Sequence, residues 1–188
     1  MQSYIEQWVE RILVNAKTLH NLMELGAELG QDSKLSQAQY ESVLLQASHN
    51  ASGLVLGNLI AGSLEMRPLP SSQVWIKLIL EARDPEIGSH IIRDLVPFMD
   101  VTSLLKDLIE IAMSGSASEK NRVAYTLYGA TVVITRTLQN NDVFRSGQSL
   151  RKAELIRPLA KALPCFHDKH DHRLVNAALH SLQQPDLG

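Results

Sequence analysis

The sequence is poor in cysteine, in aromatic residues and in excess charge of either sign. Its 188 residues include a single cysteine, so no internal disulfide can form, and a reducing cytoplasmic location is expected. Aromatic residues account for only 5% and apolar residues for 45%, a composition typical of helical proteins packed through aliphatic side chains. The formal net charge of −2 provides no global field for nucleic acid or an acidic membrane surface.

The chain also lacks long apolar runs and alternating strand patterns. The most apolar stretch, between Ser48 and Gly62, has a run of roughly 14 residues, whereas a membrane-spanning helix needs about 20. The first residues show no basic segment followed by an apolar core, so no secretory signal is expected. No segment alternates apolar and polar residues over a useful length. These absences predict an all-α chain that does not span a membrane.

Helical spacing of apolar residues and capping signals are abundant. The segment 101–138 reads as a helical hairpin, with Ser116 and Glu119 at capping-box spacing in its turn. One long helix is predicted over 3–29, capped by Ser3, and a second begins at Ser36. The glycine-rich stretch up to Gly62 predicts a tightly packed buried helix, with a hinge or a small ligand cavity as the alternative.

The organisation predicted is a single domain over 1–188, with N-terminal helices in 1–64, three helix pairs in 71–184 and a tail over 185–188. The prolines of segment 67–70 mark the clearest connection, because proline disfavours helix in the residues before it. The three pairs cover 73–99, 101–138 and 149–184. Asn140 to Asp142 is predicted to form a turn, Pro158 to bend a helix, and Asp171 to begin the last one.

The three pairs resemble HEAT or armadillo-like repeats over about residues 73–184. The matching positions are an Asp-Pro step at an inter-helix turn and an arginine followed by small residues early in a second helix: Asp84 with Pro85, Arg122 with Ala124, and Arg173 with Ala177 and Ala178. Gly88 departs from the pattern, since the family favours arginine there. The resemblance implies a right-handed stack of antiparallel helix pairs, an α-α superhelix. The alternative is an irregular helical bundle built from ordinary amphipathic pairs.

A cluster of potential metal ligands lies between residues 165 and 172. Cys165, His167, His170 and His172 supply sulfur and nitrogen donors of the kind that zinc binds. Their spacing matches no standard zinc motif. The alternative is a solvated turn between helices in which Asp168 closes one helix. The sequence therefore predicts no required cofactor and leaves a divalent metal at this turn as an open alternative.

Catalytic patterns are absent from the sequence. Cys165 and His167 are two residues apart and would not face each other on a helix, and no nucleophile-elbow or phosphate-loop motif is present. No catalytic residue is predicted, and an enzyme is not expected.

The function predicted is that of a non-catalytic protein-protein interaction module. Stacked helix pairs present extended surfaces, so the chain could act as an adaptor or as an inhibitor of a partner protein, for example in an immunity- or antitoxin-like role. The predicted binding residues are Arg93, Arg122, Tyr125, Tyr128 and Arg173. The alternative for the arginines is solvated surface or ion pairing within the stack. The alternative function is a metal- or small-ligand-responsive regulator that uses the histidine-rich turn. Nucleic acid is not an expected partner, and the sequence does not indicate an oligomeric state.

Overall fold

The structure is a computed structural model that describes residues 3–15, 21–139 and 151–184, the side chains of 133–139 excepted. Helices account for 78% of the structure, and no strand occurs in these ranges. The all-α class is thereby confirmed. The superhelical arrangement and the HEAT-like resemblance stay predictions, and the predicted turn at 140–142 and tail at 185–188 lie outside the described residues.

The chain divides into two compact units, Met1–Ile91 and Ile92–Gly188, with the division inside α6. The helices up to that point are α1 (Tyr4–Asn15), α2 (Leu22–Gln31), α3 (Gln37–Ser48), α4 (Gly53–Ser63), α5 (Ser72–Glu81) and α6 (Ile87–Leu95). The remaining elements are α7 (Val101–Ser114), α8 (Ala117–Gln139), α9 (Lys152–Ala162), the short 3-10 helix η2 (Leu163–Cys165) and α10 (Lys169–Gln183). The prediction of a single domain stays a prediction.

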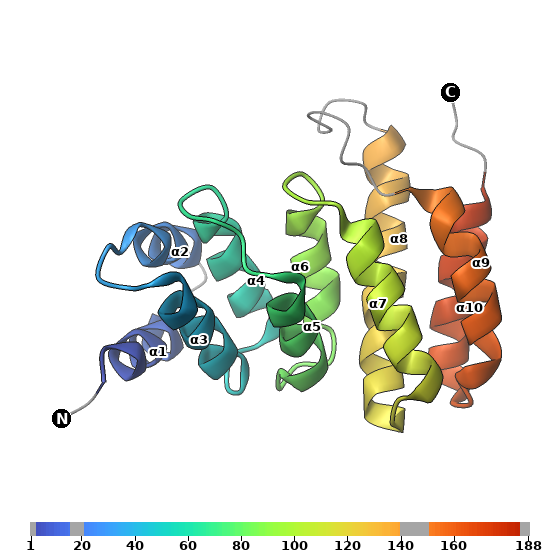
Figure 1. Ribbon diagram of the computed structural model, residues 1–188, viewed down its shortest axis with the longest axis horizontal. Helices are drawn as coiled ribbons and strands as arrows, with labels where there is room; N and C mark the ends of the chain where they lie inside the picture. The colour runs from blue at the N-terminus through green and yellow to red at the C-terminus, as the bar shows by residue number, and fades with distance from the viewer. Residues whose placement is uncertain (1–2, 16–20, 140–150, 185–188) are drawn as a thin grey trace. The chain divides into compact units, whose positions relative to one another are not determined.

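In the first unit, α1 packs on α3, α3 on α5, and α2 on α4 (Figure 1). The buried side chains between these helices are mainly aliphatic, joined by Trp8, Tyr40 and Trp75. Ser36 begins α3 with the predicted capping box, since its hydroxyl accepts from the Gln39 amide and the Gln39 side chain accepts from the Ser36 amide. The apolar stripes that the sequence shows are therefore the surfaces that meet in the core.

The predicted single helix over 3–29 is wrong, because the structure has two separate helices, α1 and α2, in its place. The Trp8 indole donates to the Asp32 carboxylate at 2.8 Å and the Tyr4 hydroxyl donates to it at 2.6 Å. In a continuous helix the 24 positions from Trp8 to Asp32 would span about 36 Å. The contacts with Asp32 therefore require the chain to turn back between α1 and the end of α2. The predicted cap at Ser3 is confirmed, since its hydroxyl accepts from the Glu6 amide at 3.2 Å.

Glycines set the distance between α2 and α4. A Cβ added to Gly26 would overlap the Leu59 carbonyl oxygen and lie 2.9 Å from the Leu59 carbonyl carbon. One added to Gly62 would overlap the Met23 carbonyl oxygen and lie 2.7 Å from the Met23 carbonyl carbon. The two backbones thus approach as closely as small residues permit. This confirms the prediction that the glycine-rich stretch forms a tightly packed buried helix.

The turn before α6 forms hydrogen bonds with the end of α3 and with the start of α4. The Arg83 amide donates to the carbonyl of Ser48, the last residue of α3, at 2.9 Å. The Asp84 carboxylate accepts from the Gly53 amide of α4 at 2.6 Å and from the Glu86 amide at 2.9 Å. Asp84 therefore accepts a hydrogen bond within the turn that leads into α6 and also satisfies the first amide of α4.

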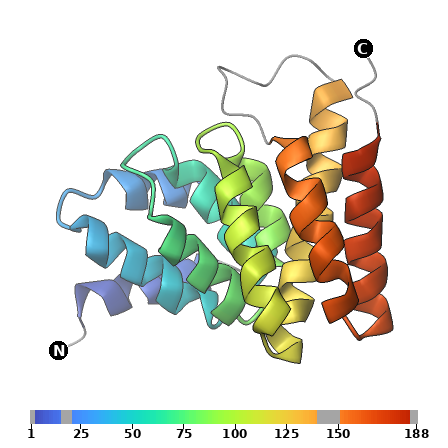
Figure 2. The ribbon, with the colours of Figure 1, turned by 45° about the vertical axis from the view of Figure 1, so that its right-hand side comes forward.

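In the second unit, α7 packs on α9 and α8 on α10, while α7 also contacts α8 and α9 contacts α10 (Figure 2). The predicted hairpin of α7 and α8 is present, and its capping box is confirmed by hydrogen bonds in both directions between Ser116 and Glu119. Pro158 lies inside α9, which runs from Lys152. The two helix pairs of this unit thus pack with their first helices, α7 and α9, in contact and with their second helices, α8 and α10, in contact.

Candidate functional site

Three of the predicted binding residues lie on α8, the second helix of the central hairpin. Arg122 and Tyr125 are half-buried, and Tyr128 is 40% exposed. Between them Val123, Ala124 and Leu127 are buried against the neighbouring helices. Helical periodicity therefore separates the fully buried set from a set that is half-buried at Arg122 and Tyr125 and exposed at Tyr128.

The start of α10 differs from the prediction, because Asp168 and not Asp171 is the cap. The Asp168 carboxylate accepts from the His170 amide at 2.8 Å and from the Asp171 amide at 3.2 Å. Asp171 lies within the first turn of the helix, is only 4% exposed, and accepts from the Asn121 side chain of α8 at 2.7 Å. Asp168 has the more favourable position, since its side chain can reach two free amides at once.

A second contact joins α10 to α8 beside the Asn121–Asp171 hydrogen bond. The Nε2 atom of His170 lies 3.1 Å from the Tyr125 hydroxyl, and the two rings are tilted with centroids 5.6 Å apart. Arg173 follows on α10 and is exposed. We call Arg122, Tyr125, Tyr128, His170 and Arg173 the α8–α10 face. It combines aromatic rings and guanidinium groups from two helices that pack on each other.

The structure does not bring the fifth predicted residue, Arg93, into this group. Arg93 lies on α6, and its Nε and Nη2 atoms donate to the neighbouring Asp94 at 2.8 and 3.1 Å. The hydrogen bond that Arg93 donates to Asp94 is the main cause that raises the pKa of Arg93 above its ordinary value. Among the described residues, Arg93 forms no hydrogen bond or ion pair with the α8–α10 face. For Arg93, ion pairing, the alternative given above, is what the structure shows.

The four potential metal ligands are distributed along the turn and the start of α10. Cys165 ends η2 and is half-buried, while His167 and His172 are exposed. His170 is engaged with Tyr125. Within the described ranges, no group of three histidine, cysteine or acidic side chains is placed so that it could hold a metal ion.

Among the carboxylates at helix starts of this unit, Glu119 and Asp168 are held in their charged form mainly by backbone amides. The Ser116 amide, with the Ser116 hydroxyl, holds the pKa of Glu119 below its ordinary value of 4.5. The amides of Asp171 and His170 hold the pKa of Asp168 below its ordinary value of 3.8. A carboxylate whose pKa is lower in the folded chain contributes stability above its unfolded pKa and loses that contribution as the pH falls through its folded pKa.

We therefore expect the second unit to lose stability as the pH falls from about 5 to about 2. The double variant Glu119→Gln and Asp168→Asn keeps an acceptor at both positions but removes both titrations, so its stability should depend less on pH. The measurement is the urea midpoint reported by the methyl signals of Met99 and Met113, both in this unit. Identical pH profiles for the variant and the parent would contradict the assignment.

Sequence reasoning did not identify the hydrogen bond between the half-buried Asn121 and the buried Asp171. Asn121 and Tyr125 are four residues apart on α8, and their partners Asp171 and His170 are adjacent on α10. The spacing places the two α8 residues on one face. Nothing in the sequence says that α10 is the helix that this face meets.

Comparison of the chain with known protein families, with curated proteins and with solved structures finds no match. Among the described helices, none combines the length and the apolar character that crossing a membrane requires.

Proposed function

We propose that the chain is a non-catalytic module that binds another protein through the α8–α10 face, as an adaptor or as an inhibitor of that partner. The observation that supports this most directly is the contact between Tyr125 and His170, which joins two neighbouring helices into one surface. Tyr128 and Arg173, each three residues further along the same helix, are exposed. Tyrosine and arginine are enriched among the residues that supply most of the energy at protein interfaces.

The two rings also make this face suited to binding without large rearrangement. Tyr125 is already positioned by His170, and both side chains extend from helices that are packed against each other. A side chain fixed before binding loses less conformational entropy when the partner arrives. The proposal therefore assigns the central anchors to Tyr125 and Tyr128, and the charged contacts to Arg122 and Arg173.

The test begins with affinity capture of the tagged protein from its native lysate, followed by identification of the bound proteins. We expect one stoichiometric protein partner. The double variant Arg122→Glu and Arg173→Glu should weaken that complex at least about tenfold, because it reverses two charges at the interface. Unchanged affinity would contradict the assignment of this face.

Two controls keep that result interpretable. Arg122 is half-buried and its Nη1 atom is enclosed without a hydrogen-bond partner among the described residues, so folding of the variant is checked by circular dichroism. A second variant, Tyr128→Ser with Arg173→Glu, changes only exposed side chains and should also weaken binding. The matched control for Arg122→Glu with Arg173→Glu is Lys77→Glu with Arg83→Glu, which makes the same change in net charge at exposed positions of the first unit and should bind normally.

A further inference from the structure

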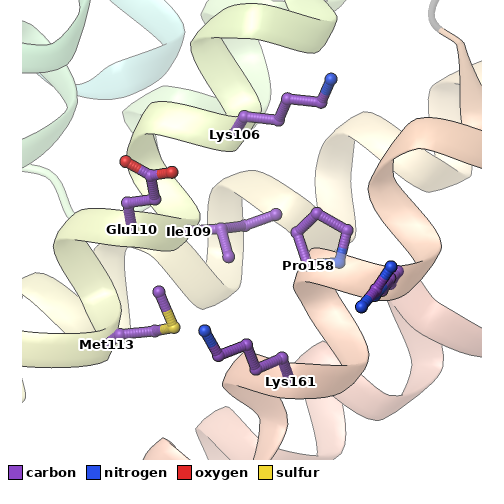
Figure 3. Close-up of a pocket in the computed structure, with 7 residues that line it drawn as sticks. Lys106, Ile109, Glu110, Met113, Pro158 and Lys161 are labelled. Carbon is purple, nitrogen blue, oxygen red and sulfur yellow. The ribbon is translucent and has the colours of Figure 1, made fainter.

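A pocket of about 300 Å³ lies between α7 and α9 (Figure 3). Lys106, Ile109, Glu110 and Met113 of α7 form one side. Arg157, Pro158 and Lys161 of α9 form the other. None of these residues belongs to the α8–α10 face, so the pocket is a separate feature of the second unit.

The centre of the pocket is apolar. Ile109 is fully buried, and Met113 and Pro158 are half-buried. Figure 3 shows Ile109 directed toward the Pro158 ring, and the Met113 and Lys161 side chains directed toward one another. Methionine is flexible and polarizable, so its side chain adapts to the shape of a group inserted beside it. This part of the pocket suits an aliphatic side chain.

The charged residues around the pocket are mostly cationic. Arg157 and Lys161 are exposed and four residues apart on α9, and neither forms an ion pair within the described part of the chain. Lys106, in contrast, is paired with Glu154. The lining includes three cations and one anion, in a chain whose formal net charge is −2. The local positive charge is therefore not a consequence of the overall composition.

We propose that this pocket binds an acidic segment of a partner protein, with a carboxylate at Arg157 and Lys161 and a neighbouring aliphatic side chain against Ile109, Met113 and Pro158. The cations on α9 favour a carboxylate by charge complementarity, and the apolar centre favours an aliphatic side chain next to that carboxylate. The volume lies at the lower limit for pockets that enclose a whole small ligand. It suits one anchoring side chain of a larger molecule, with the acidic group held at the α9 edge.

Glu110 determines on which side of the pocket the carboxylate of the segment binds. It lies on the α7 side and is exposed, so it repels a carboxylate that approaches from that side. The acidic group of the segment is therefore placed against α9 and not between the two helices. Replacing Glu110 with glutamine removes the repulsion and should strengthen binding of an acidic segment by about two- to threefold.

The test uses protein with labelled methionine methyl groups and the probe peptide acetyl-Gly-Asp-Leu-Glu-Leu-Asp-Gly-amide. The Met113 signal should shift saturably during titration, while the signals of Met23 and Met66, exposed in the first unit, should not move. The matched peptide with asparagine and glutamine in place of the acids should bind at least about tenfold more weakly. Hexanoate serves as a small carboxylate probe.

Variants then separate this pocket from the α8–α10 face. Arg157→Glu with Lys161→Glu should weaken peptide binding at least about tenfold, and the affinity of that variant should no longer fall with added salt. Arg122→Glu with Arg173→Glu should leave peptide binding unchanged. If Arg122→Glu with Arg173→Glu leaves the captured partner bound, the proposal for the α8–α10 face has failed. If Arg157→Glu with Lys161→Glu leaves peptide binding unchanged, the proposal for the pocket has failed.

Three results would overturn the pocket assignment. The first is a Met113 signal that does not shift with the acidic peptide. The second is equal affinity for the acidic and the amide peptides, which would make the cations irrelevant. The third is saturation of Met113 by hexanoate at the same concentration as by the peptide, which would make the pocket a site for small carboxylates and not for a protein segment.

Discussion

Replacing Gly26 or Gly62 with alanine is expected to lower the free energy of unfolding of the first unit by about 3 kcal/mol or more. In an ordinary helix the same change would stabilise, since alanine is favoured over glycine by roughly 0.5–1 kcal/mol. Here the new methyl group would overlap a backbone carbonyl oxygen of the facing helix, Leu59 in one case and Met23 in the other. Backbone cannot rotate away as a side chain can, so α2 and α4 would have to separate.

Gly57→Ala is the matched control for this prediction. Gly57 lies on the same helix as Gly62, but its added Cβ would meet the Cβ of the His90 side chain at 3.0 Å and no backbone atom. The change in stability should stay within about 1 kcal/mol. Unfolding is followed by tryptophan fluorescence, because both tryptophans, Trp8 and Trp75, lie in the first unit. Equal effects at positions 57 and 62 would contradict the close approach of the two backbones.

Replacing Asn121 with leucine is expected to cost the second unit about 2–3 kcal/mol of stability, because it removes a donor to a buried carboxylate. Asp171 is 4% exposed, so water cannot readily substitute for the Asn121 amide. The measurement is the urea unfolding free energy from the methyl signals of Met99 and Met113. A loss below about 0.5 kcal/mol would show that the hydrogen bond contributes little.

A double variant tests the cause of that loss. When both polar partners are replaced by apolar groups, no buried group is left without its partner, and the cost becomes small. Asn121→Leu combined with Asp171→Leu should therefore be more stable than Asn121→Leu alone. If the double variant is the less stable of the two, the loss arises from packing and not from the unpaired carboxylate.

The sequence predicted most of the helices and many of their starts, since these depend on residues close together in the chain. The capping boxes at Ser36 and Ser116 each involve residues three apart, and both are present. The break between α1 and α2 could not be predicted in this way. Apolar residues continue at helical spacing between the two helices, whereas the contact that requires the chain to turn back joins Trp8 to the distant Asp32.

For the candidate sites, the sequence predicts which residues share one face of a helix but not which helices bring their residues together. Arg122, Tyr125 and Tyr128 share α8 with the spacing expected of one face, but His170 was considered only as a metal ligand. Its contact with Tyr125 depends on how α10 packs against α8. The pocket is a similar case, because Arg157 and Lys161 are visible as neighbours on one helix, while Met113 faces them from another.

The turn that contains Arg83 and Asp84 has a consequence for how this chain can change in length. Surface connections usually accept insertions and deletions, because few interactions depend on them. This turn differs, since its backbone ends α3 at Ser48 and its carboxylate begins α4 at Gly53. One added residue there would move both contacts out of reach. Length variation in the first unit is therefore best tolerated elsewhere, since this short turn holds the end of α3 and the start of α4.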